Sequence, residues 1–186
     1  MKKLINDAGL VEQQMFEGMA KAHPSYLRRL ECGSVFVRAR PSRNKVALIS
    51  GGGSGHEPAH VGFVGKGMLD CAVAGSIFTS PTPDQILEGI KAIANEKGVL
   101  MIVKNYTGDV MNFEMAADLA RDEGILVDHV VTNDDVAVQD SLYTTGRRGV
   151  AGTFFVHKIA GAKAEQGAPL EEVSTKIGRA SCRERV

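Results

Sequence analysis

Three side chains in two short segments are of the types needed for acid–base chemistry on a small molecule. His56 lies near the end of the run SGGGSGHEP at 50–58, and Lys104 and Asp109 bound the segment KNYTGD. An imidazole titrates near neutral pH and can take a proton from a hydroxyl group. A lysine can hold an oxygen or phosphoryl charge, and an aspartate can accept a hydrogen bond from an alcohol or help to deprotonate it. The set suits phosphoryl transfer to a small polyol or keto-alcohol.

The glycines that precede His56 indicate close approach of a ligand to bare backbone. Four of the five residues 51–55 are glycine, whereas a structural turn needs only one or two. Exposed N–H groups in this loop would orient a carbonyl or phosphoryl oxygen. Two nucleotide-binding motifs do not fit: GxGxxG begun at Gly51 would need glycine in place of His56, and the Walker A motif would need a lysine after the glycines.

His56 and His60 also form an HExxH motif, which in metalloproteases places two histidines on one zinc ion. Pro58 weakens this interpretation, because proline is favoured in the first turn of a helix and unfavourable inside one. We expect a helix to begin near Glu57 or Pro58, which leaves His56 in the glycine loop and makes His60 a packed or exposed helical histidine. No metal site is predicted, and a zinc hydrolase remains a third hypothesis.

Apolar periodicity predicts strands and helices in alternation. The predicted strands cover 35–37, 46–49, 70–74, 99–103 and 125–132, and the predicted helices cover 8–22, 83–96, 110–122 and 150–166. This order predicts an α/β fold: a mostly parallel sheet with helices on both faces. Because ligands bind at the carboxyl ends of such strands, the loops after 46–49 and 99–103 should meet at one edge.

A purely structural interpretation of the three side chains remains open. In that interpretation Asp109 caps the helix at 110–122, Lys104 is solvated and His56 is a turn residue. Convergence of the two loops at the same edge of the sheet would favour the chemical interpretation over this one.

Two pairs of charged residues have no assigned role. Asp134 and Asp135 predict an acidic turn after the strand at 125–132 rather than a magnesium site. Arg147 and Arg148 would either meet the phosphates of a partner or begin a solvated helix. The sequence does not decide between these two roles of the arginines.

Composition excludes several classes of protein. The 186 residues carry 22 basic and 22 acidic side chains, and a formal net charge of zero disfavours binding to nucleic acid or to a membrane surface. No apolar window reaches the roughly 18 residues that a membrane span needs. Three widely spaced cysteines without a CxxC pair are typical of a reducing compartment, which predicts a cytoplasmic protein.

The last ten residues, IGRASCRERV, differ abruptly in composition from the helix-like segment before them. Back-translated, they match one reading frame of a common sequencing adapter. We therefore expect a natural domain over 1–176 whose gene continues further, and a foreign tail over 177–186. The alternative is a natural basic tail.

Four longer blocks resemble the substrate-binding K subunit, or first domain, of dihydroxyacetone kinases. They are SGGGSGHEP at 50–58, IFTSPTPDQI at 77–86, KNYTGDVMNFEMA at 104–116 and DDVAVQDSLYTTGRRGVAGT at 134–153. The resemblance covers about residues 1–176 and implies the N-terminal half of the K-subunit fold. It also implies which residues meet dihydroxyacetone: Gly53, Ser54, Gly55, His56, Lys104 and Asp109.

The resemblance further implies the role of each catalytic group. Asp109 would hydrogen-bond a substrate hydroxyl, and His56 would accept the proton of that hydroxyl as it attacks phosphorus, with Asp109 as an alternative base. The chemistry of the residues agrees, because a histidine is already poised near pH 7 whereas the pKa of an aspartate must be raised.

Partners and cofactors follow from the resemblance in the same way. The chain would bind no cofactor itself, and a separate L subunit or domain would hold ADP or ATP with Mg, recharged in many bacteria by a phosphotransferase-system protein. A homodimer with a role in glycerol metabolism is implied. The family's second histidine, which holds the substrate as a covalent hemiaminal, would lie beyond residue 176, so the chain alone should bind weakly and transfer little phosphate. The alternative within the family is a non-catalytic sensor of dihydroxyacetone that acts as a co-activator.

Overall fold

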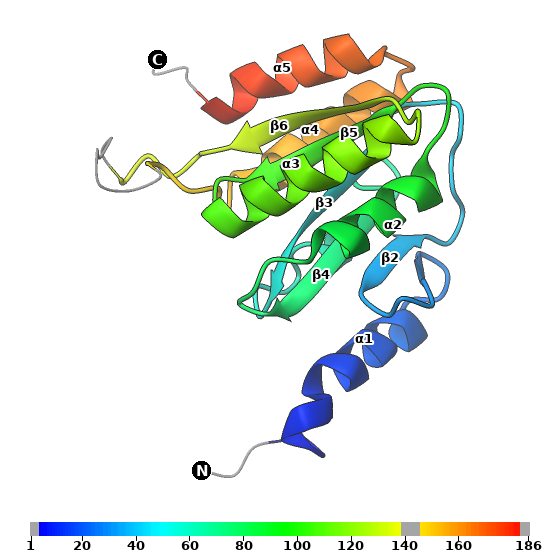
Figure 1. Ribbon diagram of the computed structural model, residues 1–186, viewed down its shortest axis with the longest axis vertical. Helices are drawn as coiled ribbons and strands as arrows, with labels where there is room; N and C mark the ends of the chain where they lie inside the picture. Colours follow the sequence, from blue (N-terminus) through cyan, green and yellow to red (C-terminus); the bar gives the residue numbers. More distant parts are fainter. Residues whose placement is uncertain (1–3, 139–145, 183–186) are drawn as a thin grey trace.

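The computed structural model describes residues 4–138 and 146–182 and has the α/β architecture that Figure 1 shows. Its strands are β1 Leu27–Arg29, β2 Val35–Arg38, β3 Ala47–Ser54, β4 Cys71–Ile77, β5 Val99–Lys104 and β6 Val127–Thr132. Its α-helices are α1 Val11–Ala22, α2 Pro83–Ile93, α3 Thr107–Asp122, α4 Thr153–Glu165 and α5 Leu170–Cys182, with short 3-10 helices η1 Ala8–Leu10 and η2 Val61–Phe63. Residues 139–145 of the block at 134–153, and residues 183–186 of the predicted tail, lie outside the described residues.

The six strands of the described residues form one mixed sheet in the order β1-β2-β4-β3-β5-β6. Strands β4, β3, β5 and β6 are parallel to one another, which confirms the predicted mostly parallel sheet. Strand β2 pairs antiparallel with both β4 and β1, and the sequence did not predict β1. With only three residues, Leu27–Arg29, β1 is too short for its alternation to be recognised.

The core has two layers, one on each face of the sheet. Successive strand residues point to opposite faces, so Leu48 packs with the layer beneath α4 and α5 while Ile49 packs with the layer beneath α2 and α3. Figure 1 shows α2 and α3 on one side of the sheet and α4 on the other. This two-sided cover explains why the central strands are apolar without alternation.

Two helical segments begin at residues suited to a helix start. Asp7 accepts a hydrogen bond from Gly9 N (2.7 Å) at the start of η1, and Pro83 begins α2, where Thr82 N donates to Gln85 Oε1 (3.0 Å). Helix α5 continues across the predicted boundary after residue 176, and Ile177 is buried in the core. The foreign origin of 177–186 stays a prediction.

Two predicted boundaries near the glycine run are wrong. Strand β3 extends through Ser54 instead of ending before the glycines, and no helix begins at Glu57 or Pro58. The segment after His56 turns instead, with bonds from Ala59 N to His56 O (3.1 Å) and from Gly62 N to Pro58 O (2.8 Å), before η2. Further along, α3 begins at Thr107 rather than at 110, and α4 at Thr153 rather than at 150.

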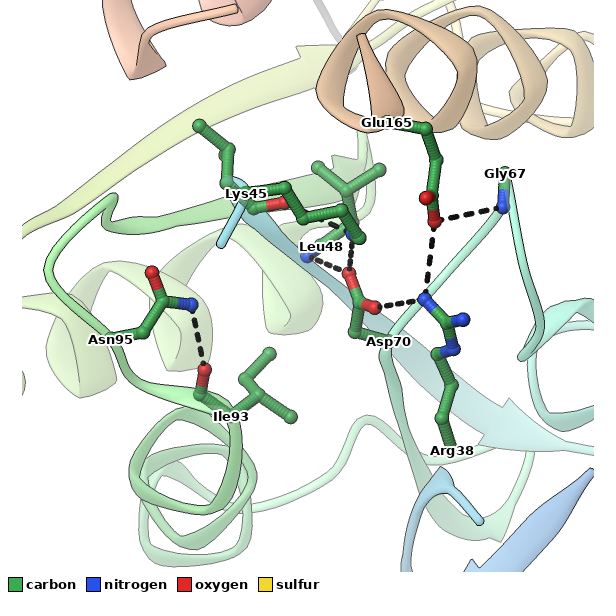
Figure 2. Close-up of polar contacts among 9 residues, drawn as sticks. Arg38, Lys45, Leu48, Gly67, Asp70, Ile93, Asn95 and Glu165 are labelled. Atoms are coloured by element: carbon green, nitrogen blue, oxygen red, sulfur yellow. Dashed lines mark hydrogen bonds and ion pairs between the residues drawn. The ribbon is translucent and has the colours of Figure 1, made fainter. Parts of the chain in front are cut away.

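A buried ion cluster fixes the amino ends of β3 and β4 (Figure 2). Asp70, directly before β4, accepts hydrogen bonds from Lys45 Nζ at 2.5 Å, Leu48 N at 2.9 Å and Arg38 Nη1 at 2.9 Å. Both Lys45 and Asp70 are almost fully buried, and Arg38 also contacts Glu165 of α4 at 3.2 Å. The cluster therefore ties β2, β3, β4 and α4 together at the edge opposite the carboxyl ends of the parallel strands.

Candidate functional site

Strand β3 carries the glycines to the carboxyl edge of the sheet, where backbone rather than side chains fills the space. A Cβ on Gly51 would lie 2.5 Å from Val73 O, and one on Gly53 would lie 2.6 Å from Thr79 N. Only glycine allows these two approaches. Ser54 is buried, and its Oγ donates to Gly75 O at 2.6 Å. Strand packing therefore requires glycine at positions 51 and 53, and Gly53 brings β3 against the segment that follows β4.

His56 follows β3 and lies exposed at the rim of the site. Its ring meets Phe78 edge to face, with the centroids 5.1 Å apart and an interplanar angle of 75°. Phe78 follows β4, has a φ of 53° and is 71% exposed, and its ring also packs over Gly55, where a Cβ would lie 3.1 Å away. A residue other than glycine with positive φ is uncommon and typical of functional loops. Phe78 therefore orients the histidine from the neighbouring strand.

Lys104 is the last residue of β5 and is buried. Burial lowers the pKa of its ammonium group, and the nearby Asp109 carboxylate acts in the opposite direction. The Nζ atom lies 5.3 Å from the centre of the Tyr106 ring. The backbone of Gly149 covers the lysine closely, because a Cβ there would lie 2.9 Å from Lys104 Cα. The lysine is therefore held inside the fold, which overturns the alternative of a solvated side chain.

Asp109 lies in the first turn of α3 and is also buried. Its carboxylate accepts a hydrogen bond from Ser80 Oγ, a partner that sequence reasoning missed. Burial raises the pKa of Asp109, whereas the Ser80 hydrogen bond and the charges of Lys104 and His56 lower it. Because Tyr106 precedes the helix as its cap, Asp109 is not the capping residue. The carboxylate, the ammonium and the imidazole therefore act on one another, as the convergence of the two loops predicts.

A cavity of about 610 Å³ opens between the end of β3 and the start of α4. His56 and Lys104 line it, together with apolar side chains that include Phe63 and Phe154, whereas Asp109 is not among the described residues that line it. The volume falls in the range usual for small-molecule sites, and a few polar groups in a mostly apolar wall are typical of them.

His60 lines the same cavity. It lies in a turn and not in the helix that the sequence predicts. It is buried and lies directly before η2, where Ser50 Oγ is 3.3 Å from its Nδ1. His157 of α4 places Nε2 3.3 Å from the same Nδ1 atom. The histidine pair spans 97 positions of sequence, so no local pattern could predict it. His60 is therefore a packed histidine, as one of the two alternatives predicted, but it lies in a turn and not on a helix.

The residues after β6 support the start of α4. Asp134 accepts hydrogen bonds from Val150 N (2.9 Å) and Gly152 N (2.7 Å), and Asp135 Oδ1 accepts one from Ala137 N (3.2 Å). These contacts agree with the predicted acidic turn. The Arg148 guanidinium lies 5.3 Å from the centre of the Tyr106 ring, at the same distance from this ring as the Lys104 ammonium.

Arg147 makes one hydrogen bond through its backbone and one through its side chain to residues that precede it in the sequence. Its carbonyl accepts a hydrogen bond from Asn105 Nδ2 (2.6 Å), and its Nε donates to Val138 O (3.3 Å). Arg147 and Arg148 therefore help to place the segment that covers Lys104, and neither begins a helix, because α4 starts only at Thr153. This result excludes one of the two alternatives for the arginines, the solvated helix start.

Comparison with known proteins identifies the family. The Dak1 domain model matches residues 17–185. The PTS-dependent dihydroxyacetone kinase 1, dihydroxyacetone-binding subunit DhaK, of Listeria innocua is 61% identical over 173 residues, which are 93% of this chain and 53% of the relative. The dihydroxyacetone kinase of Citrobacter freundii, solved in a native form and with AMP-PNP and Mg²⁺, superposes with a TM-score of 0.88 and 44% identity over 97% of this chain.

A third similar structure is a dihydroxyacetone kinase operon co-activator, with a TM-score of 0.83 and 40% identity over 88% of this chain and half of its own length. The chain spans about half the length of the Listeria relative and a third of the Citrobacter kinase. Since the family model covers nearly all of the sequence, the chain belongs to the Dak1 domain family.

Proposed function

We propose that the chain binds dihydroxyacetone and positions it for phosphorylation to dihydroxyacetone phosphate. The observation that carries this proposal is the meeting of His56, Lys104 and Asp109 at the carboxyl ends of β3 and β5, with the charges of His56 and Lys104 acting on the buried Asp109 carboxylate. The Listeria relative is a dihydroxyacetone-binding subunit, which supports the same substrate.

The three side chains have separate roles in this proposal. Lys104 donates to a substrate oxygen, and Asp109 accepts a hydrogen bond from the reacting hydroxyl group. As that oxygen forms a bond to phosphorus and the donor's bond to phosphorus breaks, His56 takes the hydroxyl proton. Its exposed position beside Phe78 suits this role, because the base must meet a donor that arrives from outside the chain.

The phosphoryl donor belongs to a separate L subunit or domain in this proposal. The Citrobacter kinase, which is about three times as long as this chain, was solved with AMP-PNP and Mg²⁺, and the Listeria relative is PTS-dependent. Within the described part of the chain, no helix is long and apolar enough to cross a membrane. The homodimer, the cytoplasmic location and the role in glycerol metabolism stay predictions.

A second candidate function is sensing of dihydroxyacetone without phosphoryl transfer. It is favoured by the structural similarity to the operon co-activator, whose TM-score of 0.83 is close to that of the kinase. The retained His56 and Asp109 favour the kinase, because a sensor needs no proton acceptor. Turnover therefore separates the two candidates, since both would bind the ligand.

Binding tests the shared part of the proposal. Titration of the ¹⁵N-labelled chain with dihydroxyacetone should shift the backbone signals of Gly53, Lys104 and Asp109, and Asp109→Asn should weaken binding at least tenfold. Asp118→Asn is the matched control, because Asp118 lies on the same helix and is exposed. The absence of saturable shifts at the site up to molar ligand would refute substrate binding by this chain.

Turnover tests the catalytic part. In the chain extended to the length of its relatives and supplied with an L subunit and phosphoryl donor, His56→Ala and Asp109→Asn should each lower turnover by orders of magnitude while folding persists. Near-normal turnover of both variants would reject the assigned roles. Saturable binding in the absence of any wild-type turnover would favour the sensor.

A further inference from the structure

The polar contacts of His60 indicate which of its ring nitrogens carries the proton. Ser50 Oγ donates to Ile102 O at 2.6 Å, so its single proton is used there, and the contact at 3.3 Å with His60 must be a bond that Nδ1–H donates. His157 Nε2, 3.3 Å from the same atom, then presents a lone pair. His60 therefore carries its proton on Nδ1 and has an acceptor lone pair on Nε2.

His60 Nε2 lies on the same side of the cavity as the ammonium group of Lys104. His60 Nε2 is buried, and no described residue gives it a hydrogen-bond partner. A Cβ on Gly52 would lie 3.5 Å from this atom and 2.9 Å from Lys104 Nζ. The acceptor of His60 and the cationic donor of Lys104 thus lie beside the same backbone position, and both residues line the cavity described above.

This combination of partners matches a hydroxyl group. A hydroxyl oxygen can accept a hydrogen bond from the ammonium and its proton can be donated to the imidazole nitrogen, whereas a carbonyl or carboxylate oxygen would leave the lone pair unpaired. Burial lowers the pKa of His60 well below its ordinary value, so the ring stays neutral and keeps its lone pair. A buried acceptor left without a partner is unfavourable, which gives the pairing its specificity.

We propose that His60 Nε2 and Lys104 Nζ together bind one hydroxyl group of the polyol substrate, which makes His60 a specificity-determining residue. The inference deepens the proposed function and rests on it. An ordered water offers the same chemistry, so the test compares ligands that differ by one hydroxyl group. Dihydroxyacetone has two hydroxyl groups and hydroxyacetone has one.

The first measurement is the tautomer of His60 in the ligand-free chain. Long-range ¹H–¹⁵N correlation spectra at neutral pH should show a protonated Nδ1 and an unprotonated Nε2. A protonated Nε2 would overturn the proposal whatever the binding data, because the acceptor would not exist.

The second measurement is binding of the two ligands to the wild-type chain and to His60 variants, followed by chemical-shift titration. His60→Asn keeps an amide donor near the Nδ1 position and removes the Nε2 acceptor, and His60→Gln can place its amide oxygen near Nε2. The wild type should bind dihydroxyacetone about tenfold more tightly than hydroxyacetone, a difference of about 1.4 kcal/mol. His60→Asn should lose this preference, and His60→Gln should retain part of it.

His129→Asn is the matched control, because this histidine lies on β6 and is not among the residues of the cavity wall. Unchanged binding by His60→Asn would overturn the proposal and leave the proposed function standing. If His60→Asn weakens the binding of both ligands equally, His60 Nε2 binds a water molecule rather than a substrate hydroxyl group. That result would also overturn the proposal. If the wild type binds neither ligand, the proposed function fails and the inference fails with it.

Discussion

Replacing Asp70 by asparagine should destabilise the fold by about 3–5 kcal/mol, the usual effect of breaking a buried ion pair. Asp70 accepts bonds from Lys45 Nζ, Leu48 N and Arg38 Nη1, and the side chains of Asp70 and Lys45 are 5% and 4% exposed. An asparagine retains the shape and one acceptor oxygen but leaves the Lys45 ammonium without a counter-charge. Arg38 loses less, because Glu165 remains 3.2 Å away.

Urea unfolding followed by circular dichroism measures this effect. Asp118→Asn is the control, because the Asp118 side chain is 77% exposed and its pair with Arg121 should contribute less than about 1 kcal/mol. A double-mutant cycle with Lys45→Met isolates the pair: the double variant should lose less stability than the sum of the two single variants. An Asp70→Asn variant within about 1 kcal/mol of the wild type, with an unchanged m-value, would refute the assignment of a buried, paired charge.

Two further perturbations separate the site from the fold. Gly52→Ala places a Cβ 2.9 Å from Lys104 Nζ, the free end of a flexible side chain, so stability should stay within about 1 kcal/mol of the wild type while dihydroxyacetone binding weakens at least tenfold in a titration. Gly18→Ala, whose Cβ would meet nothing within 4 Å, should leave binding unchanged.

Acid should unfold the protein partly through His157. Burial lowers its pKa from 6.5 to about 3, so below pH 6.5 the unfolded state binds a proton that the folded state does not, and stability falls by up to about 1.4 kcal/mol per pH unit until about pH 3. His157→Gln should flatten this part of the stability profile in urea unfolding measured from pH 7 to pH 4, and an unchanged slope would contradict the buried neutral state.

The sheet and the meeting of the two loops could be predicted because they depend on local patterns. The continuous apolar run before Lys104 predicts a strand covered on both faces, and the carboxyl ends of parallel strands share one edge. The course of the glycine run could not be predicted in this way. Gly51 and Gly53 read as a loop, but their missing side chains allow close packing against β4 and the segment after it, which depends on tertiary structure.

The partners of the site residues were missed for the same reason. Ser80 is 29 positions from Asp109, and His157 is 97 positions from His60, so neither pair leaves a periodic signal. Pro58 led to the prediction of a helix that begins beside it and contains His60, but the chain turns there instead. The contact between His60 and Ser50, on which the inferred tautomer of His60 rests, likewise joins residues that only the fold brings together.

The two ends of β3 differ in how much side-chain packing holds them. Its first residues contribute to both core layers and adjoin the Asp70 cluster, whereas Gly51–Gly53 add no side-chain atoms to either layer. Backbone amides near Leu48 should therefore exchange with solvent only through global unfolding, and those near Gly53 through local opening of lower free energy. The carboxyl end of β3 can then open locally while the core and the opposite edge of the sheet stay intact.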